Sequence, residues 1–79
     1  MDSRTIEQMI LSGLPEADVV VSGDDGVHFE AHVRFAGFEG KTTLQCHRMV
    51  YATLGSAMGN EIHALGLVTA VPDEAGSAS

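Results

Sequence analysis

The histidines are the side chains of this chain best suited to metal chemistry. His28 and His32 fall on one face of a predicted strand, but strand residues four apart are separated by about 13 Å, too far to share one zinc ion. His63 follows Ile62 at the start of another predicted strand, where an exposed imidazole could reach a soft metal or cluster on a partner. Taken alone, His63 is more simply interpreted as structural. Because one imidazole is an incomplete metal site, metal binding requires a partner that brings the other ligands.

Cys46 is the only cysteine, and His47 follows it directly. Adjacent helical residues point about 100° apart, so this thiol and imidazole cannot meet as a nucleophile and its base. We interpret them as a partly buried cysteine beside a surface histidine. A single cysteine excludes an intramolecular disulfide and is typical of a reducing compartment. The N-terminal segment is polar and no run of 18 apolar residues occurs, so we expect a cytoplasmic protein with no membrane partner.

The segment from Gly37 to Thr42 is similar to a phosphate-binding loop only in part. Two residues separate Gly37 from Gly40, whereas the phosphate-binding motif needs four. The same spacing occurs in the RNA-clamping loop of KH domains, but here the segment joins a predicted strand to a predicted helix. A turn followed by a helix cap is the interpretation that remains.

Size and charge narrow the function further. A chain of 79 residues, 44% of them hydrophobic, can build one modest core, which favours partner interfaces over a deep catalytic pocket. We therefore expect a binding module and not an enzyme. The net charge of −7, from eleven acidic and four basic residues, opposes binding to phosphate-rich partners. The basic residues are well separated in sequence: Arg4, Arg34, Lys41 and Arg48.

The elements that position these residues begin with a helix. Apolar residues at helical spacing predict it from Ser3 to Ser12, and Thr5 with Gln8 could form its capping box. Gly13 suits a left-handed position at the end of this helix, and Pro15 cannot continue it. We expect the chain to turn there.

Two strands that form a hairpin are predicted next. Successive valines favour a strand from Ala17 to Ser22. Asp24 and Asp25 lack the spaced ligands and closing glutamate of a calcium loop, so we expect a hairpin turn there. The returning strand, from Val27 to Phe35, alternates between apolar and polar residues. Its predicted polar face carries His28, Glu30, His32 and Arg34.

A second helix is predicted from Thr43 to Leu54, with a capping box formed by Thr42 and Gln45. Its predicted apolar stripe consists of Leu44, Val50, Tyr51 and Leu54. A short helical turn from Ser56 to Asn60 follows, and apolar, β-compatible sequence then predicts a last strand from Ile62 to Val71, ended by Pro72. The tail from Asp73 to Ser79 is expected to be disordered.

The predicted order of elements is therefore α-β-β-α-α-β. The connection between the second and third strands is long enough to contain helices and to place these strands parallel. We expect an α+β (α/β) fold in which helices cover one face of a three-stranded mixed sheet. The polar face of the hairpin is then left toward solvent.

Several motifs together resemble the BolA family. They are Phe38-Glu39-Gly40-Lys41-Thr42, Leu44-Gln45-x-His47-Arg48-x-Val50-Tyr51, Ile62-His63-Ala64-Leu65 and Pro72. Matching turns at Ser22-Gly23-Asp24 and His28-Phe29 extend the resemblance from about Ile6 to Pro72. The resemblance implies a BolA-like domain over residues 1–72, similar to type II KH domains. It also implies a helix-turn-helix-like surface from Thr43 to Asn60.

Members of this family partner monothiol glutaredoxins and share a bridging [2Fe-2S] cluster. The resemblance implies that His63 is a ligand to a cluster held mainly by partner thiolates and glutathione. The family's second ligand comes from the loop between the first two strands, where Ser22 to Val27 contains neither Cys nor His, and His28 is the nearest substitute. We assign the partner interface to His47 and Tyr51. We expect a monomer or weak homodimer, without a cluster when alone, that acts in iron-sulfur cluster trafficking or iron regulation.

The alternative implied by the resemblance is a DNA-binding transcriptional regulator in a stress response, with Lys41 and Arg48 contacting phosphates. The family often has basic residues at the positions of Thr43, Cys46 and Val68, and this chain lacks those charges. Each lost phosphate contact removes its share of affinity. Glutaredoxin partnership is therefore the leading hypothesis.

Overall fold

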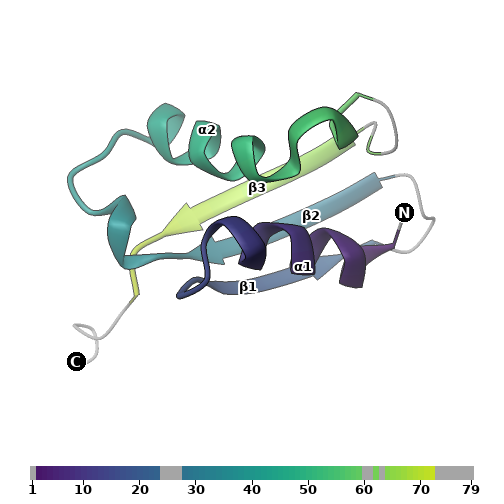
Figure 1. The fold of residues 1–79 in the computed structure, drawn as a ribbon. Helices are drawn as coiled ribbons and strands as arrows, with labels where there is room; N and C mark the ends of the chain where they lie inside the picture. Colours follow the sequence, from purple (N-terminus) through teal and green to yellow (C-terminus); the bar gives the residue numbers. More distant parts are fainter. Residues whose placement is uncertain (1, 24–27, 60–61, 63, 73–79) are drawn as a thin grey trace.

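The computed structural model describes residues 2–23, 28–59, 62 and 64–72 of the chain. Within these residues, two α-helices cover one face of a three-stranded sheet (Figure 1). The elements are α1 (Ser3–Gly13), β1 (Asp18–Ser22), β2 (His28–Arg34), α2 (Thr43–Leu54) and β3 (Ala64–Ala70), with 3-10 helices at Ala36–Phe38 and Gly55–Ala57. The predicted α+β class and the order of elements are confirmed, and the second of the two consecutive helices is a 3-10 turn.

The sheet has the order β1-β2-β3, with β2 at its centre. β1 pairs with β2 in the antiparallel sense, so that Asp18 lies opposite Arg34. β3 pairs with β2 in the parallel sense, from His28 opposite Ala64 to Arg34 opposite Ala70. The sheet is therefore mixed, as predicted, and β2 and β3 begin at the same end of it.

The alternation along β2 separates the helix-covered face of the sheet from its open face. Phe29, Ala31 and Val33 are buried, whereas the polar residues that alternate with them are exposed. This is the pattern predicted from the sequence, because strand side chains point to opposite faces in turn. The buried residues of both helices and of the sheet form one core: Ile6, Ile10, Leu14, Val19, Phe29, Ala31, Val33, Phe38, Cys46, Val50, Leu54, Ala57 and Ile62.

The N-terminal cap of α1 is Asp2, so the predicted capping box of Thr5 and Gln8 is wrong. The backbone of Asp2 is extended, at φ −122° and ψ 171°, and its Oδ1 accepts a hydrogen bond of 2.8 Å from the Thr5 amide. Thr5 is already inside the helix and donates to the cap. The hydrogen bond from the Thr5 backbone is the main cause that lowers the pKa of the Asp2 carboxyl below its usual value.

Gly13 does not take the left-handed conformation predicted for it. Among the described residues, positive φ angles occur at Gly40, Gly55 and Gly59. Gly13 stays in the last turn of α1, and a Cβ atom placed on it would lie 2.5 Å from Cγ2 of Thr53 on α2. The glycine is needed because the two helices approach closely there, and not to end the helix.

The second helix confirms its predicted cap and corrects its predicted apolar stripe. Thr42 Oγ1 accepts from the Gln45 amide at 3.1 Å, and Gln45 Oε1 accepts from the Thr42 amide at 2.9 Å. The buried stripe consists of Cys46, Val50 and Leu54, spaced four residues apart. Leu44, which was predicted to be in the stripe, is instead 59% exposed, and Tyr51 is 36% exposed.

The C-terminal elements are shorter than predicted. The helical turn expected from Ser56 to Asn60 is a 3-10 helix at Gly55–Ala57. The last strand, expected from Ile62, begins at Ala64, and Ile62 forms a single bridge with Met58. The expected hairpin turn at Asp24 and Asp25 and the expected tail at residues 73–79 lie outside the described residues, as does His63.

We predict that Gly13→Ala lowers the free energy of unfolding by about 1–2 kcal/mol, because the new methyl group overpacks the contact between the helices. Thr53 cannot easily turn away, since its Oγ1 donates a hydrogen bond of 2.6 Å to the Val50 carbonyl. Urea unfolding followed by circular dichroism measures the change.

Thr53→Ser provides the matched control, because it removes Cγ2 and keeps the hydroxyl. The cost of Gly13→Ala should become smaller in the Thr53→Ser background. An equal cost in both backgrounds would contradict the proposed helix-helix contact.

Candidate functional site

The histidine end, defined by His28, Ile62 and Ala64, lies where β2 and β3 begin. His28 is exposed and is the register partner of Ala64 across the parallel pair. His63 lies outside the described residues, but it is covalently bonded to Ile62 and to Ala64, which are both described. At the histidine end, the strand that carries His28 is therefore hydrogen-bonded to the strand that begins directly after His63 in the sequence.

Ile62 anchors the chain directly before His63. Its side chain is completely buried, and its amide donates a hydrogen bond of 2.9 Å to the Ala57 carbonyl. Its carbonyl accepts a second hydrogen bond, also 2.9 Å, from the Gly59 amide. The position of Ile62, two residues before β3, is therefore held by the burial of its side chain and by hydrogen bonds to both of its backbone groups.

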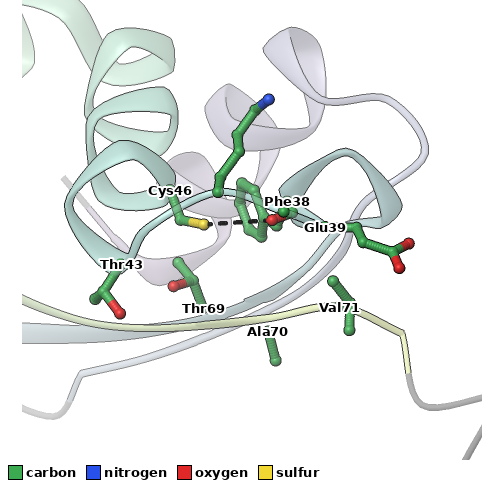
Figure 2. A pocket seen from close by; sticks show the side chains of 9 residues that line it. Phe38, Glu39, Thr43, Cys46, Thr69, Ala70 and Val71 are labelled. Carbon is green, nitrogen blue, oxygen red and sulfur yellow. Dashed lines mark hydrogen bonds between the residues drawn. The ribbon is translucent and has the colours of Figure 1, made fainter.

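Cys46 lies at the opposite end of the sheet from the histidine end. Its thiol is buried and donates a weak hydrogen bond of 3.9 Å to the Phe38 carbonyl (Figure 2). With Thr69 and Ala70 near the end of β3, it lines a cavity of about 320 Å³. The seven residues of β3 extend over about 20 Å. The thiol therefore cannot share a metal ion or a small cluster with an imidazole at the histidine end.

The two predicted partner residues, His47 and Tyr51, share one side of α2 with Leu44 and Arg48, and we name these four residues the α2 stripe. Helical spacing of three, four and seven residues places these side chains on one surface. Leu44 and Tyr51 are partly or largely exposed apolar residues, Arg48 is exposed and His47 is half-buried. Leu44 was predicted to belong to the apolar stripe of the helix, and its exposure is what adds it to this surface.

The direction of α2 relates its stripe to the histidine end. Its first turn lies near the end of β3, since Thr43 and Cys46 line one cavity with Thr69 and Ala70. Its last turn leads through Gly55–Ala57 to the beginning of β3 (Figure 1). Tyr51 is therefore the member of the stripe nearest to the histidine end along the helix, and Leu44 lies about 10 Å farther away.

Residues 13–74 of the chain match a protein family that is described as "BolA-like protein". The chain belongs to the BolA family. The resemblance inferred from the sequence motifs is thus confirmed.

Solved structures of BolA proteins share the fold. A BolA homologue from Coxiella burnetii has 48% sequence identity and a TM-score of 0.84, and the match covers 96% of this chain and 97% of that one. The BolA domain of SufE1 from Arabidopsis thaliana has 25% identity and a TM-score of 0.75, with 91% of this chain and 93% of that one covered.

Some of the curated relatives are much longer proteins. Chloroplastic BOLA1 of Arabidopsis thaliana is 37% identical over 54 residues, which cover 68% of this chain and 34% of BOLA1. The chain thus spans about a third of the length of that relative. Neither α-helix of the described residues has the length and apolar character needed to cross a membrane.

The four basic residues of this BolA protein belong to different segments of the fold. Arg4 is on α1 and Arg34 is on the open face of the sheet. Arg48 is on the α2 stripe, whereas Lys41 lies before the helix and lines the cavity beside Cys46. Of the two residues predicted to contact nucleic acid, Arg48 therefore lies on the side of α2 and Lys41 lies before its first turn, beside the end of β3.

The described residues contain no group of three or more His, Cys, Asp or Glu side chains that could hold a metal ion. His28 and His32 share the open face of β2 but lie four residues apart, about 13 Å along the strand. The strand that this estimate assumed is confirmed, since both histidines lie within β2.

We predict that Cys46 reacts slowly with a thiol reagent such as Ellman's reagent in the native protein and rapidly after unfolding. The reason is that its side chain is buried, with 6% exposure, and its thiol faces the Phe38 carbonyl. The measurement is the absorbance of the released thiolate with time.

Leu44→Cys in a Cys46→Ser background provides the control, since residue 44 is 59% exposed two positions earlier on the same helix. This variant should react at least about tenfold faster than the wild type. Equal rates would show that Cys46 is accessible in the native fold.

Proposed function

We propose that this BolA protein is a cytosolic binding protein that docks a monothiol glutaredoxin and shares a bridging [2Fe-2S] cluster with it. The observation that carries the proposal is the register of β2 and β3. It pairs His28 with Ala64, the residue directly after His63, while the only thiol of the chain lies buried at the other end of the sheet. In this role the chain contributes imidazole ligands and the partner contributes thiolates.

Ligand chemistry supports this division. Iron-sulfur clusters are held mainly by cysteine thiolates, and replacement of thiolates by histidine on an iron raises the reduction potential. A chain whose one thiol is buried cannot hold such a cluster alone, so the thiolates come from glutaredoxin and glutathione. His63, and His28 as the second candidate, would complete the ligand set from the BolA side.

The α2 stripe is the surface we assign to docking. Tyr51 and Arg48 are residue types that contribute strongly to binding in protein interfaces. Leu44 adds an apolar side chain that is 59% exposed, and His47 lies between these residues on the same side of the helix. A partner that covers the end of the stripe near Tyr51 would also approach the histidine end.

The relatives support an iron-sulfur-related role in which a BolA domain works together with another protein. A BolA domain forms part of SufE1, and the matched residues cover 15% of the SufE-like protein 1 sequence. DNA binding lacks comparable support, because the chain has only four basic residues and its net charge is −7.

We predict that His63→Ala changes the visible absorption and circular dichroism spectrum of the complex reconstituted with glutaredoxin, glutathione, iron and sulfide. His28→Ala should change it as well if both histidines bind the cluster, because loss of an imidazole alters the ligand field of the iron. His32→Ala is the matched control, since it lies on the same face of β2 but four residues from His28.

The spectrum of the His32→Ala complex should equal that of the wild type. An unchanged spectrum in His63→Ala would remove this residue from the ligand set, and the same holds for His28→Ala.

We predict that Tyr51→Ala weakens the affinity for the cluster-free glutaredoxin by about tenfold, because it removes an aromatic side chain from the docking surface. Isothermal titration calorimetry measures the dissociation constant. Gln8→Ala, at an exposed position of α1, is the control and should bind as the wild type does. If Tyr51→Ala binds with wild-type affinity, the α2 stripe is not the docking surface, whatever the histidines do.

A further inference from the structure

On the open face, three rows of side chains are in register across all three strands, and His28 with Ala64 forms a further row at the start of β2 and β3. The central row consists of Val20, His32 and Val68. The two flanking rows are Asp18, Arg34 and Ala70 on one side, and Ser22, Glu30 and Gly66 on the other. No helix of the described residues covers this face, since α1 and α2 both lie on the opposite side (Figure 1).

The central row places two exposed apolar side chains on either side of a histidine. Val20 is 63% exposed and Val68 is 46% exposed, and they lie on either side of His32. The imidazole of His32 is half-exposed, with its Nε2 3.5 Å from Oε2 of Glu30. Apolar side chains at the centre with charged side chains around them are also the arrangement found in protein interfaces.

The charges of the flanking rows determine which partner fits. On β2, Glu30 lies two residues before His32 and Arg34 lies two residues after it. Consider a second copy stacked on this face and related to the first by a twofold axis along the central row. The strands of the second copy then run in the opposite direction. Glu30 of each copy then lies opposite Arg34 of the other, while Val20 and Val68 each meet their own counterparts.

We propose that the open sheet face binds a second copy of this chain, in a face-to-face dimer with its twofold axis along the row Val20, His32 and Val68. Two equal pairs of Glu30 with Arg34 fix the orientation. The other in-plane axis, parallel to the strands, would place Arg34 opposite Arg34 and Glu30 opposite Glu30, and like charges in contact disfavour it.

The shape of the face agrees with this arrangement. A hollow on the open face is lined by Asp18, Val20, Ser22, His32 and Arg34. Arg34 of the second copy lies over the row of Glu30 and Ser22, where its long side chain can enter the hollow. The small residues Gly66 and Ala70 meet at the margin and allow the sheets to approach.

The size of the face determines the strength of the dimer. Three strands about 4.8 Å apart, each with about seven residues, present roughly 300 Å² per copy, well below the roughly 800 Å² of a stable interface. The dimer is therefore weak and forms at high protein concentration. It leaves the α2 stripe uncovered and does not depend on the glutaredoxin proposal.

Sedimentation equilibrium up to about 1 mM protein tests the proposal. The wild type should show a monomer-dimer equilibrium, and Arg34→Glu should weaken it by about tenfold or more, because each pair becomes two facing carboxylates. The double variant Glu30→Arg/Arg34→Glu restores the pairs with exchanged signs and keeps the net charge. Its dissociation constant should return to within about threefold of the wild type.

Arg4→Glu is the matched control, because it changes the net charge as Arg34→Glu does but lies on α1. It should leave the dimerisation constant within about threefold of the wild type, and binding of glutaredoxin should be unchanged in Arg34→Glu. The proposal is overturned by a wild type that stays monomeric at 1 mM, by equal effects of Arg4→Glu and Arg34→Glu, or by a double variant that does not recover.

Amide chemical shifts on dilution give a second, independent measurement. The largest changes should map to Val20, His32 and Val68, the residues on the proposed axis. Changes that map to the α2 stripe instead would show self-association through a different surface and would also overturn the proposal.

Discussion

The parallel pairing of β2 with β3 is the interaction on which the arrangement of this protein depends. Parallel neighbours need a long crossover, and here the crossover contains α2, which must return along the sheet to the start of β3. The same pairing places His28 opposite Ala64 and leaves Cys46 near the other end of β3. One set of backbone hydrogen bonds therefore separates the imidazole of His28 from the thiol of Cys46, and in the proposed cluster role the thiolates must come from a partner.

The alternation along β2 gives the two layers of the molecule different surfaces. Its buried residues hold α1 and α2 against the sheet, and the helix layer presents the α2 stripe, with Tyr51 toward the histidine end. Its exposed residues form the open face, where Glu30 and Arg34 flank His32. The α2 stripe and the open face therefore lie on opposite sides of one small core, and His28, at the start of β2, is on the side of the open face.

Local sequence patterns predicted the elements well and their ends less well. The period of β2 and the capping box of Thr42 and Gln45 depend on neighbouring residues and were predicted correctly. The cap of α1 was assigned to Thr5, although Asp2 has the extended backbone that a cap requires. Leu44 was predicted to belong to the apolar stripe of the helix, but the direction of α2 on the sheet leaves it exposed.

The sequence by itself determined the order of elements, the inward and outward faces of β2 and membership in the BolA family, because these depend on residue types at short spacing. Only the tertiary structure decided that Gly13 is a contact between helices, that Cys46 is remote from the histidine end, and that Glu30 and Arg34 flank an exposed apolar row. Each of these depends on how segments far apart in the chain are packed together. Spacing along a sequence does not specify the distance between such segments until the register of the strands and the position of the helices are known.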